Sequence, residues 1–318
     1  MEGPAILLMG PTGAGKTDVA VELAATLPVE IISVDSAMVY RGMDIGTAKP
    51  DAATRARAPH HLVDILDPAE RYSAGRFLSD AAAASRAIAA RGRVPMLVGG
   101  TMLYFRALQS GLAELPPADP AVRRRIDERG AREGWPALHA ELARLDPAAA
   151  GKIKPTDRQR IQRALEVLEL TGRPPSERWQ EALRTGTRRQ DLKIVLAPAD
   201  RTALAARIEQ RFRRMMELGF LDEVRRLYER GDLGPELPSI RAVGYRQLWE
   251  HLAGERRLEE AVSRGMAATR QLAKRQLTWL RAEPDAIWVD ALEKGAFAQI
   301  QDRVGGWLAA RRVEKGSV

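Results

Sequence analysis

The sequence of 318 residues predicts an α/β fold, a doubly wound parallel sheet of about five strands with a helical insertion and additional C-terminal helices. Three observations support this. A glycine-rich loop stands between an apolar run and a helical pattern within residues 5–27. Four more short apolar runs follow, separated by helical patterns, as in parallel sheets. A stretch rich in proline and arginine has no convincing strand. We therefore expect a sheet domain at 1–114 and 192–318, and a helical insertion domain at 115–191.

The loop after the first strand, predicted over 5–9, carries the most specific motif. GPTGAGKT fits the phosphate-loop pattern G-x-x-x-x-G-K-[ST] and leads into a helix predicted over 18–27. Its backbone N–H groups and the helix N-terminus would surround the oxygens of a di- or triphosphate, which makes the fold P-loop NTPase-like. Lys16 would reach the outer phosphate, and the Thr17 hydroxyl would hold Mg²⁺. The loop residues predicted to bind the diphosphate are Gly10, Pro11, Thr12, Gly13, Ala14, Gly15, Lys16 and Thr17.

The second strand, predicted over 29–34, is followed directly by Asp35. Open α/β sheets bind ligands at the carboxyl ends of their strands, so Asp35 is expected to face the same crevice as the phosphate loop. The alternative is that Asp35 caps a helix, since Asp is a favourable N-cap residue. Residues 41–50 read as a loop, and His60 to Asp64 as a short edge segment.

The third strand, predicted over 94–98, follows a helix at 73–91 and ends at Gly99-Gly100-Thr101. It lacks the acidic residue that a nucleotide-hydrolysing motor usually carries there. The two glycines suit close approach of the backbone to a ligand. The alternative is a simple turn into the helix predicted over 102–110.

The fourth strand, 192–197, leads into a helix at 200–211 with Arg207 and Arg211 on one face, and the fifth strand is expected at 286–289. In P-loop phosphotransferases, arginines in this place often close over the phosphates as a lid. The alternative is a solvated basic face paired with Glu209 or Asp222.

The basic residues favour a polyanionic partner. The net charge is +8, and many arginines fall in the insertion. A helix at 268–281 alternates basic residues with glutamine and could follow an RNA backbone, although a solvated charged face would explain the same pattern. The chain has no cysteine and only four scattered histidines, which excludes disulfides and leaves no zinc pattern. No membrane span or cleavable leader is evident, so we expect a cytoplasmic protein, as a monomer.

Six blocks resemble the tRNA dimethylallyltransferases, also called isopentenyl-tRNA transferases, in their bacterial form, and the match runs nearly end to end. These blocks are GPTGAGKT at 10–17, DSAMVYRGMDIGTAKP at 35–50, LVGGTMLYFRAL at 97–108, QRIQRALEV at 159–167, SIRAVGYRQ at 239–247 and ATRQLAKRQLTWLR at 268–281. A lone phosphate loop would be weakly specific, whereas six collinear blocks are very specific. Two departures are minor: Gly13-Ala14 stands at variable positions, and the zinc finger of eukaryotic relatives is missing.

The resemblance implies transfer of a dimethylallyl group from dimethylallyl diphosphate to N6 of the adenosine 3′-adjacent to the anticodon, with release of pyrophosphate. The implied catalytic residues are Asp35, Thr101, Lys16 and Arg211, and Arg207 and Arg211 join the loop around the diphosphate. Asp35 would be the general base, because the adenine amine must lose a proton as it attacks. The residues implied for the tRNA anticodon stem-loop are Asp35, Ser36, Ala37, Met38, Thr101, Arg123, Gln159, Arg160, Ile161, Gln162, Arg163, Ile240, Arg241, Gly244, Tyr245, Arg246, Arg270 and Lys274.

Two other classes of protein share part of these features. A small-molecule or nucleoside kinase would have the phosphate loop, the carboxylate at a strand end and the lid arginines, but it does not require the basic insertion and would turn over ATP. A non-catalytic or ATP-driven RNA-binding protein would explain the basic helices. It leaves Asp35 and Thr101 without a role in the crevice.

Overall fold

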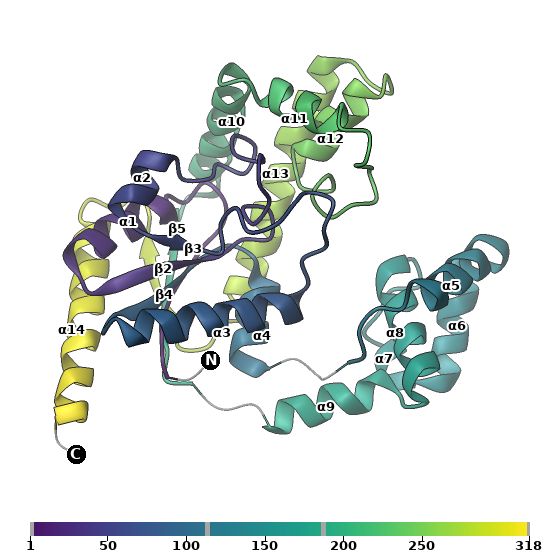
Figure 1. Ribbon diagram of the computed structural model, residues 1–318, viewed down its shortest axis with the longest axis horizontal. Coiled ribbons are helices and arrows are strands. Elements are labelled where there is room, and N and C mark those ends of the chain that lie inside the picture. The colour runs from purple at the N-terminus through teal and green to yellow at the C-terminus, as the bar shows by residue number, and fades with distance from the viewer. Residues whose placement is uncertain (1–2, 112–114, 186–188, 317–318) are drawn as a thin grey trace. The chain divides into compact units, whose positions relative to one another are not determined.

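The computed structural model describes residues 3–111, 115–185 and 189–316. The chain divides into two compact units (Figure 1). The sheet unit combines Met1–Phe105 with Arg189–Val318, and the helical unit is Arg106–Arg188. The helical unit thus starts and ends a few residues earlier in the chain than the insertion expected at 115–191.

The sheet unit contains a six-stranded, all-parallel sheet in the order β3-β2-β4-β1-β5-β6, which confirms the predicted α/β class. Its sixth strand is the two-residue edge strand β3, too short to give a periodic signal. The strands are β1 Ile6–Met9, β2 Val29–Val34, β3 His60–His61, β4 Val94–Gly99, β5 Leu192–Ala197 and β6 Ile287–Asp290.

Helices cover both faces of this sheet (Figure 1). On one face α1 (Lys16–Thr26) and α14 (Ala296–Gly316) pack on alternate residues of the strands, including Ile6, Leu8 and Ile194. Helix α3 (Ala74–Ala90) contacts β2 and β4. Burial from both sides explains why the strands are continuously apolar and not alternating.

The sheet unit has further helices, and the one at 102–110 continues into the helical unit. The helix predicted at 200–211 continues to residue 217, and the one predicted at 268–281 begins ten residues earlier, at 258. The segment from 237 to Gly244 forms turns, and its helix begins only at Tyr245. These helices are α2 Ala52–Arg57, α4 Met102–Ser110, α10 Arg201–Glu217, α11 Phe220–Tyr228, α12 Tyr245–Leu252 and α13 Leu258–Leu280.

The helical unit has a hydrophobic core of its own, in which Ile126, Leu138 and Ile161 are almost completely buried. Its described residues contain no strand. Asp119 and Asp157 cap its two longest helices by accepting backbone N–H groups. The helices are α5 Pro120–Glu133, α6 Trp135–Leu145, α7 Pro147–Ala150, α8 Arg158–Thr171 and α9 Pro175–Thr185.

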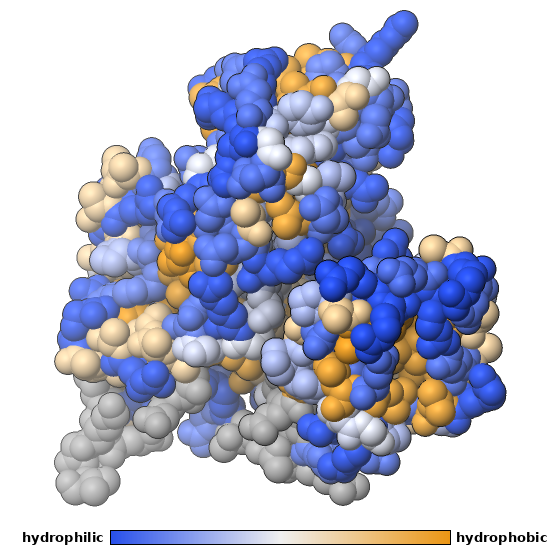
Figure 2. Space-filling view, turned by 45° about the vertical axis from the view of Figure 1, so that its right-hand side comes forward, coloured by the Kyte–Doolittle hydropathy of each residue, from blue (hydrophilic) through white to orange (hydrophobic). Residues whose placement is uncertain are grey.

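Hydrophilic side chains predominate on the face shown in Figure 2, with smaller hydrophobic areas between them. Among the residues described, no helix is both long enough and apolar enough to cross a membrane.

Candidate active site

The carboxyl ends of three neighbouring strands bring the main candidate residues together. Strand β4 lies between β1 and β2, so the phosphate loop after β1, Asp35 after β2 and Thr101 after β4 share one edge of the sheet. A cavity of about 1740 Å³ opens there, walled by these segments and by α10 and α13. This is the crevice expected from the strand order.

The phosphate loop is held in shape by its glycines. Gly13 and Gly15 have φ of 82° and 86°, in the left-handed region that side chains other than glycine rarely adopt. At Gly10 a β-carbon would lie 2.2 Å from the carbonyl oxygen of Leu196, so no larger residue fits against β5. The Lys16 ammonium donates a hydrogen bond of 2.7 Å to the carbonyl of Pro11.

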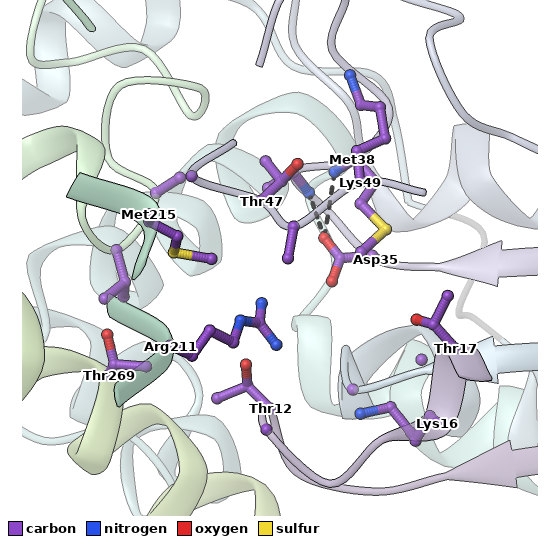
Figure 3. A pocket seen from close by; sticks show the side chains of 18 of the residues that line it. Thr12, Lys16, Thr17, Asp35, Met38, Thr47, Lys49, Arg211, Met215 and Thr269 are labelled. Carbon is purple, nitrogen blue, oxygen red and sulfur yellow. Dashed lines mark hydrogen bonds between the residues drawn. The ribbon is translucent and has the colours of Figure 1, made fainter. Parts of the chain in front are cut away.

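Two cations and one carboxylate face the cavity together: Lys16, Arg211 and Asp35 (Figure 3). Burial lowers the pKa of Lys16 to about 7, with the charge of Arg211 as the second cause and Asp35 acting in the opposite direction. Burial also lowers the pKa of Arg211, against the opposing effect of Asp35 and Asp18. Neither cation has an ion-pair partner among the residues described, so both are available to an anion.

Helix α10 lies close to the phosphate loop. A β-carbon built on Gly13 would lie 3.3 Å from Ile208, and one built on Gly15 would lie 3.6 Å from a guanidinium nitrogen of Arg207. Among the ion pairs of the described residues, neither Arg207 nor Arg211 pairs with Glu209 or Asp222. Glu209 pairs with Arg270 and Arg213, and Asp222 pairs with Arg225.

The Asp35 carboxylate has one satisfied oxygen and one that faces the cavity. Its Oδ1 accepts the N–H groups of Ala37 at 2.8 Å and Met38 at 3.2 Å. These are capping-type bonds, but the segment they stabilise is a turn and no helix follows it. Oδ2 has no hydrogen-bond partner in the described part of the chain. Thr101 stands beside this turn and its hydroxyl accepts the N–H of Ser36 at 3.1 Å.

A divalent cation would find few protein ligands here. The described residues contain no group of three acidic or histidine side chains that could hold a metal ion. Thr17 lines the cavity at the first turn of α1, and its hydroxyl has no partner among the hydrogen bonds of the described residues. One hydroxyl beside a diphosphate suits Mg²⁺, which usually keeps several waters and binds phosphate oxygens.

Some residues expected to contact tRNA belong instead to the cores. Ile161, Ile240 and Tyr245 are fully buried, and Ile161 lies within the core of the helical unit. The Tyr245 hydroxyl donates to Glu223 at 2.5 Å. Gly244 is also buried and has φ of 92° where α12 begins. The side chains of Ile161, Ile240 and Tyr245 thus have a structural role in the described fold, because a fully buried side chain is not accessible to RNA.

The other residues predicted to bind tRNA differ in their exposure and in whether they are already paired with another side chain. Arg123 and Arg163 both hold the buried carboxylate of Glu166 and are about one-third exposed. Gln162 bonds to Asp127, Arg246 to Glu250, and Arg270 to Glu209. Ser36, Gln159, Arg160, Arg241, Arg246 and Lys274 are exposed.

The sequence did not predict a role for two buried polar side chains in the site region. Glu223 of α11 accepts the backbone N–H groups of Asp44, Ile45 and Gly46. Gln276 of α13 bridges the phosphate loop and the turn after β4. Gln276 lies in the helix expected to follow an RNA backbone, and Glu223 in a segment for which no role was predicted, so the sequence did not reveal that either side chain is buried.

Comparison with known proteins shows which family this sequence resembles. The family model described as IPP transferase matches residues 38–283. A tRNA dimethylallyltransferase of Methylococcus capsulatus is 56% identical over 97% of both chains, and one of Thioalkalivibrio sulfidiphilus is 58% identical over 99% of this chain and 98% of its own.

Solved structures are also similar. The tRNA isopentenylpyrophosphate transferase of Bacillus halodurans is 35% identical with a TM-score of 0.70, over 99% of this chain and all of its own. A eukaryotic dimethylallyltransferase acting on tRNA is 28% identical with a TM-score of 0.78, over 91% of this chain and 74% of its own. With a family match over most of its length and full-length relatives above 50% identity, the chain belongs to the IPP transferase family, that of the tRNA dimethylallyltransferases.

Proposed function

We propose that the protein transfers a dimethylallyl group from dimethylallyl diphosphate to N6 of the adenosine 3′-adjacent to the anticodon in tRNA. The observation that carries this proposal is the free oxygen of Asp35 in the same cavity as Lys16 and Arg211. A diphosphate leaving group and a nitrogen that must lose a proton need this combination of cations and a base. A tRNA substrate also implies a cytoplasmic protein, and we expect it to act as a monomer.

In the reaction, N6 of adenine attacks C1 of the dimethylallyl group as the C1–O bond to the diphosphate breaks. The amine is a poor nucleophile, so Asp35 accepts an N–H and removes the proton as the N6–C1 bond forms. Its Oδ1 is fixed by two backbone N–H groups, which leaves Oδ2 oriented for the substrate. The Thr101 hydroxyl lies next to this turn, where it can contact the base or the transferred group.

The pyrophosphate gains negative charge as it leaves. This charge is larger in the transition state than in the bound substrate. It is stabilised by the loop N–H groups and by Lys16, Arg207 and Arg211. Mg²⁺, when bound, would neutralise part of the diphosphate charge, and the Thr17 hydroxyl is the residue that would hold it. The target adenine must leave its stack to reach the cavity.

A transfer assay separates this function from the alternatives. The protein is incubated with an adenosine-containing anticodon hairpin and either labelled dimethylallyl diphosphate or γ-labelled ATP. We expect the dimethylallyl label to enter the hairpin and the ATP label to stay in ATP. Transfer of the phosphate label, or binding of the hairpin with no transfer at all, would refute the proposal in favour of a kinase or an RNA-binding protein.

Lys16→Ala is expected to weaken use of dimethylallyl diphosphate by about 10- to 150-fold, because a hydrogen bond to a charged group contributes roughly 1.5 to 3 kcal/mol. Affinity for tRNA should stay unchanged. The measurement is kcat/KM for the diphosphate at saturating tRNA, with Lys294→Ala as control, since Lys294 is exposed and does not line the cavity. A normal kcat/KM at low diphosphate would rule out the phosphate-loop assignment.

Binding of the diphosphate should take up a proton above neutral pH. With a pKa of about 7 before binding, Lys16 is mostly neutral at about pH 8. The anionic diphosphate favours the ammonium and raises that pKa, so most of one proton enters the site at about pH 8 and much less at about pH 6. Calorimetric titration in buffers of different ionisation enthalpy measures this uptake. It should disappear in Lys16→Ala, and a parent protein that binds without uptake at about pH 8 would contradict the expected shift.

Binding of tRNA should depend on salt through exposed cations of both units. Arg160→Ala and Lys274→Ala should each weaken tRNA affinity and flatten the slope of log affinity against log salt by about 0.7 to 0.9. Both side chains are exposed, and diphosphate affinity should not change. Arg303→Ala on α14 removes the same charge elsewhere and serves as control. If each variant keeps the parental slope, these residues lie outside the interface.

A further inference from the structure

A single buried glutamine connects the two halves of the cavity. The side chain of Gln276, on α13, is 9% exposed. Its Oε1 accepts the N–H of Thr12 in the phosphate loop at 2.9 Å, and its Nε2 donates to the carbonyl of Gly100 at 2.8 Å. The two bonds require opposite polarity, which fixes the orientation of the amide.

A glycine in the turn after β4 leaves space for this amide. A β-carbon on Gly100 would lie 2.4 Å from Nε2 of Gln276 and 3.1 Å from the carbonyl oxygen of Gly10. Glycine at this position therefore allows the amide and the phosphate loop to approach the turn. The residue that follows is Thr101, whose hydroxyl bonds to Ser36 in the turn stabilised by Asp35.

These contacts form a continuous path from the leaving-group side of the cavity to the base. The path runs from Thr12 through Gln276 to Gly100, and from Thr101 to the turn at Asp35. Each link is a hydrogen bond or a peptide bond, so the phosphate loop and the base are held at a fixed separation. Reaction geometry is sensitive to this separation, because a shift of about 1 Å can cost roughly 100-fold in rate.

We propose that Gln276 is a positioning residue for the transfer reaction, which sets the distance between the bound diphosphate and Asp35 through its bridge between Thr12 and Gly100. This inference rests on the proposed function. Gln276 lines the cavity but has both amide groups engaged with the backbone, so it acts through the loop and the turn and not on the reacting atoms.

The test compares Gln276→Met, Gln276→Glu and the parent in single-turnover transfer with saturating tRNA hairpin and dimethylallyl diphosphate. The methionine has similar length but makes neither hydrogen bond, and we expect its chemical step to be about 10- to 100-fold slower. Hairpin affinity should stay within about two-fold, because both amide groups of Gln276 are engaged with the backbone of Thr12 and Gly100. Gly100→Ala should show the same loss, since it displaces the amide. Gln299→Met, at an exposed position of α14, should keep the parental rate.

The pH dependence of Gln276→Glu distinguishes positioning from general loss of structure. An ionised carboxylate can accept from Thr12 but repels the Gly100 carbonyl, whereas a protonated one can accept and donate like the amide. Burial raises the pKa of such a carboxyl from about 4.3 toward neutrality. We therefore expect its rate relative to the parent to rise between about pH 8 and pH 6, and to exceed that of Gln276→Met at the lower pH.

The outcomes separate this inference from the proposed function. A parent protein that does not transfer the dimethylallyl group refutes the function itself. If the parent transfers the group, a parental rate in Gln276→Met overturns the positioning role. So does a relative rate of Gln276→Glu that stays constant with pH. Because this pH dependence is measured within one variant, it decides the matter even where Gln276→Met folds poorly.

Discussion

Asp35→Asn is expected to slow the chemical step by about 10² to 10⁴-fold while leaving binding of the diphosphate largely intact. The single carbonyl oxygen of the amide can keep the bonds from the N–H groups of Ala37 and Met38, but the NH2 group that then replaces Oδ2 can neither accept the adenine N–H nor take up a proton. The turn should therefore keep its shape, and the unfolding free energy should remain within about 1 kcal/mol of the parent. Single-turnover transfer at saturating tRNA and dimethylallyl diphosphate isolates the step.

Asp302→Asn provides the matched control, since Asp302 is exposed on α14 and outside the cavity. It should transfer at the parental rate. A folded Asp35→Asn protein with a near-parental rate would return Asp35 to a purely structural role in its turn. The substitution can separate the two roles of Asp35, because Oδ1 accepts the backbone N–H groups and Oδ2 is the oxygen left free for the proton.

Glu223→Ala should lower the unfolding free energy by about 3 to 5 kcal/mol, the usual cost of breaking a buried charged network. Glu223 is 1% exposed and accepts the N–H groups of Asp44, Ile45 and Gly46 at 2.9, 2.7 and 3.1 Å. Burial and the Glu223 charge also raise the pKa of Tyr245 well above its ordinary value, so its hydroxyl stays a donor to this carboxylate. The substitution removes the acceptor of four donors, three backbone N–H groups and the buried Tyr245 hydroxyl.

Urea unfolding monitored by circular dichroism measures this loss, with Glu229→Ala as control because Glu229 is exposed at the end of the same helix. The control should change the unfolding free energy by less than about 0.5 kcal/mol. A loss of under about 1 kcal/mol in Glu223→Ala would show that the loop at 44–46 is held by other contacts.

The sequence predicted the sheet because its strands are short, apolar and buried on both faces. It also placed the phosphate loop and Asp35 on one edge of the sheet, since the ends of parallel strands must meet there. Strand β3 was visible only as a short edge segment, because two residues give no periodicity. Helix α13 begins ten residues before its basic stretch and packs against α10 and α12.

Side-chain accessibility was the part that sequence patterns could not predict. Ile161, Ile240 and Tyr245 stand in blocks that also contain exposed arginines, and neighbouring positions on a helix or turn can face the core or the solvent. The backbone partners of Glu223 in the loop at 44–46 lie 177 to 179 residues away in the chain, and those of Gln276 lie 176 and 264 residues away. Such contacts depend on the tertiary fold, so only the structure reveals them.

The most direct test of the whole account is the chemical identity of the product. A labelled dimethylallyl diphosphate is reacted with two anticodon hairpins that differ only in carrying adenosine or inosine 3′-adjacent to the anticodon, and the RNA is digested to nucleosides for mass spectrometry. We expect the label in N6-dimethylallyladenosine from the first hairpin and no label in the second, which lacks the exocyclic amine. Label in the inosine hairpin, or at any other nucleotide of the adenosine hairpin, would contradict the account.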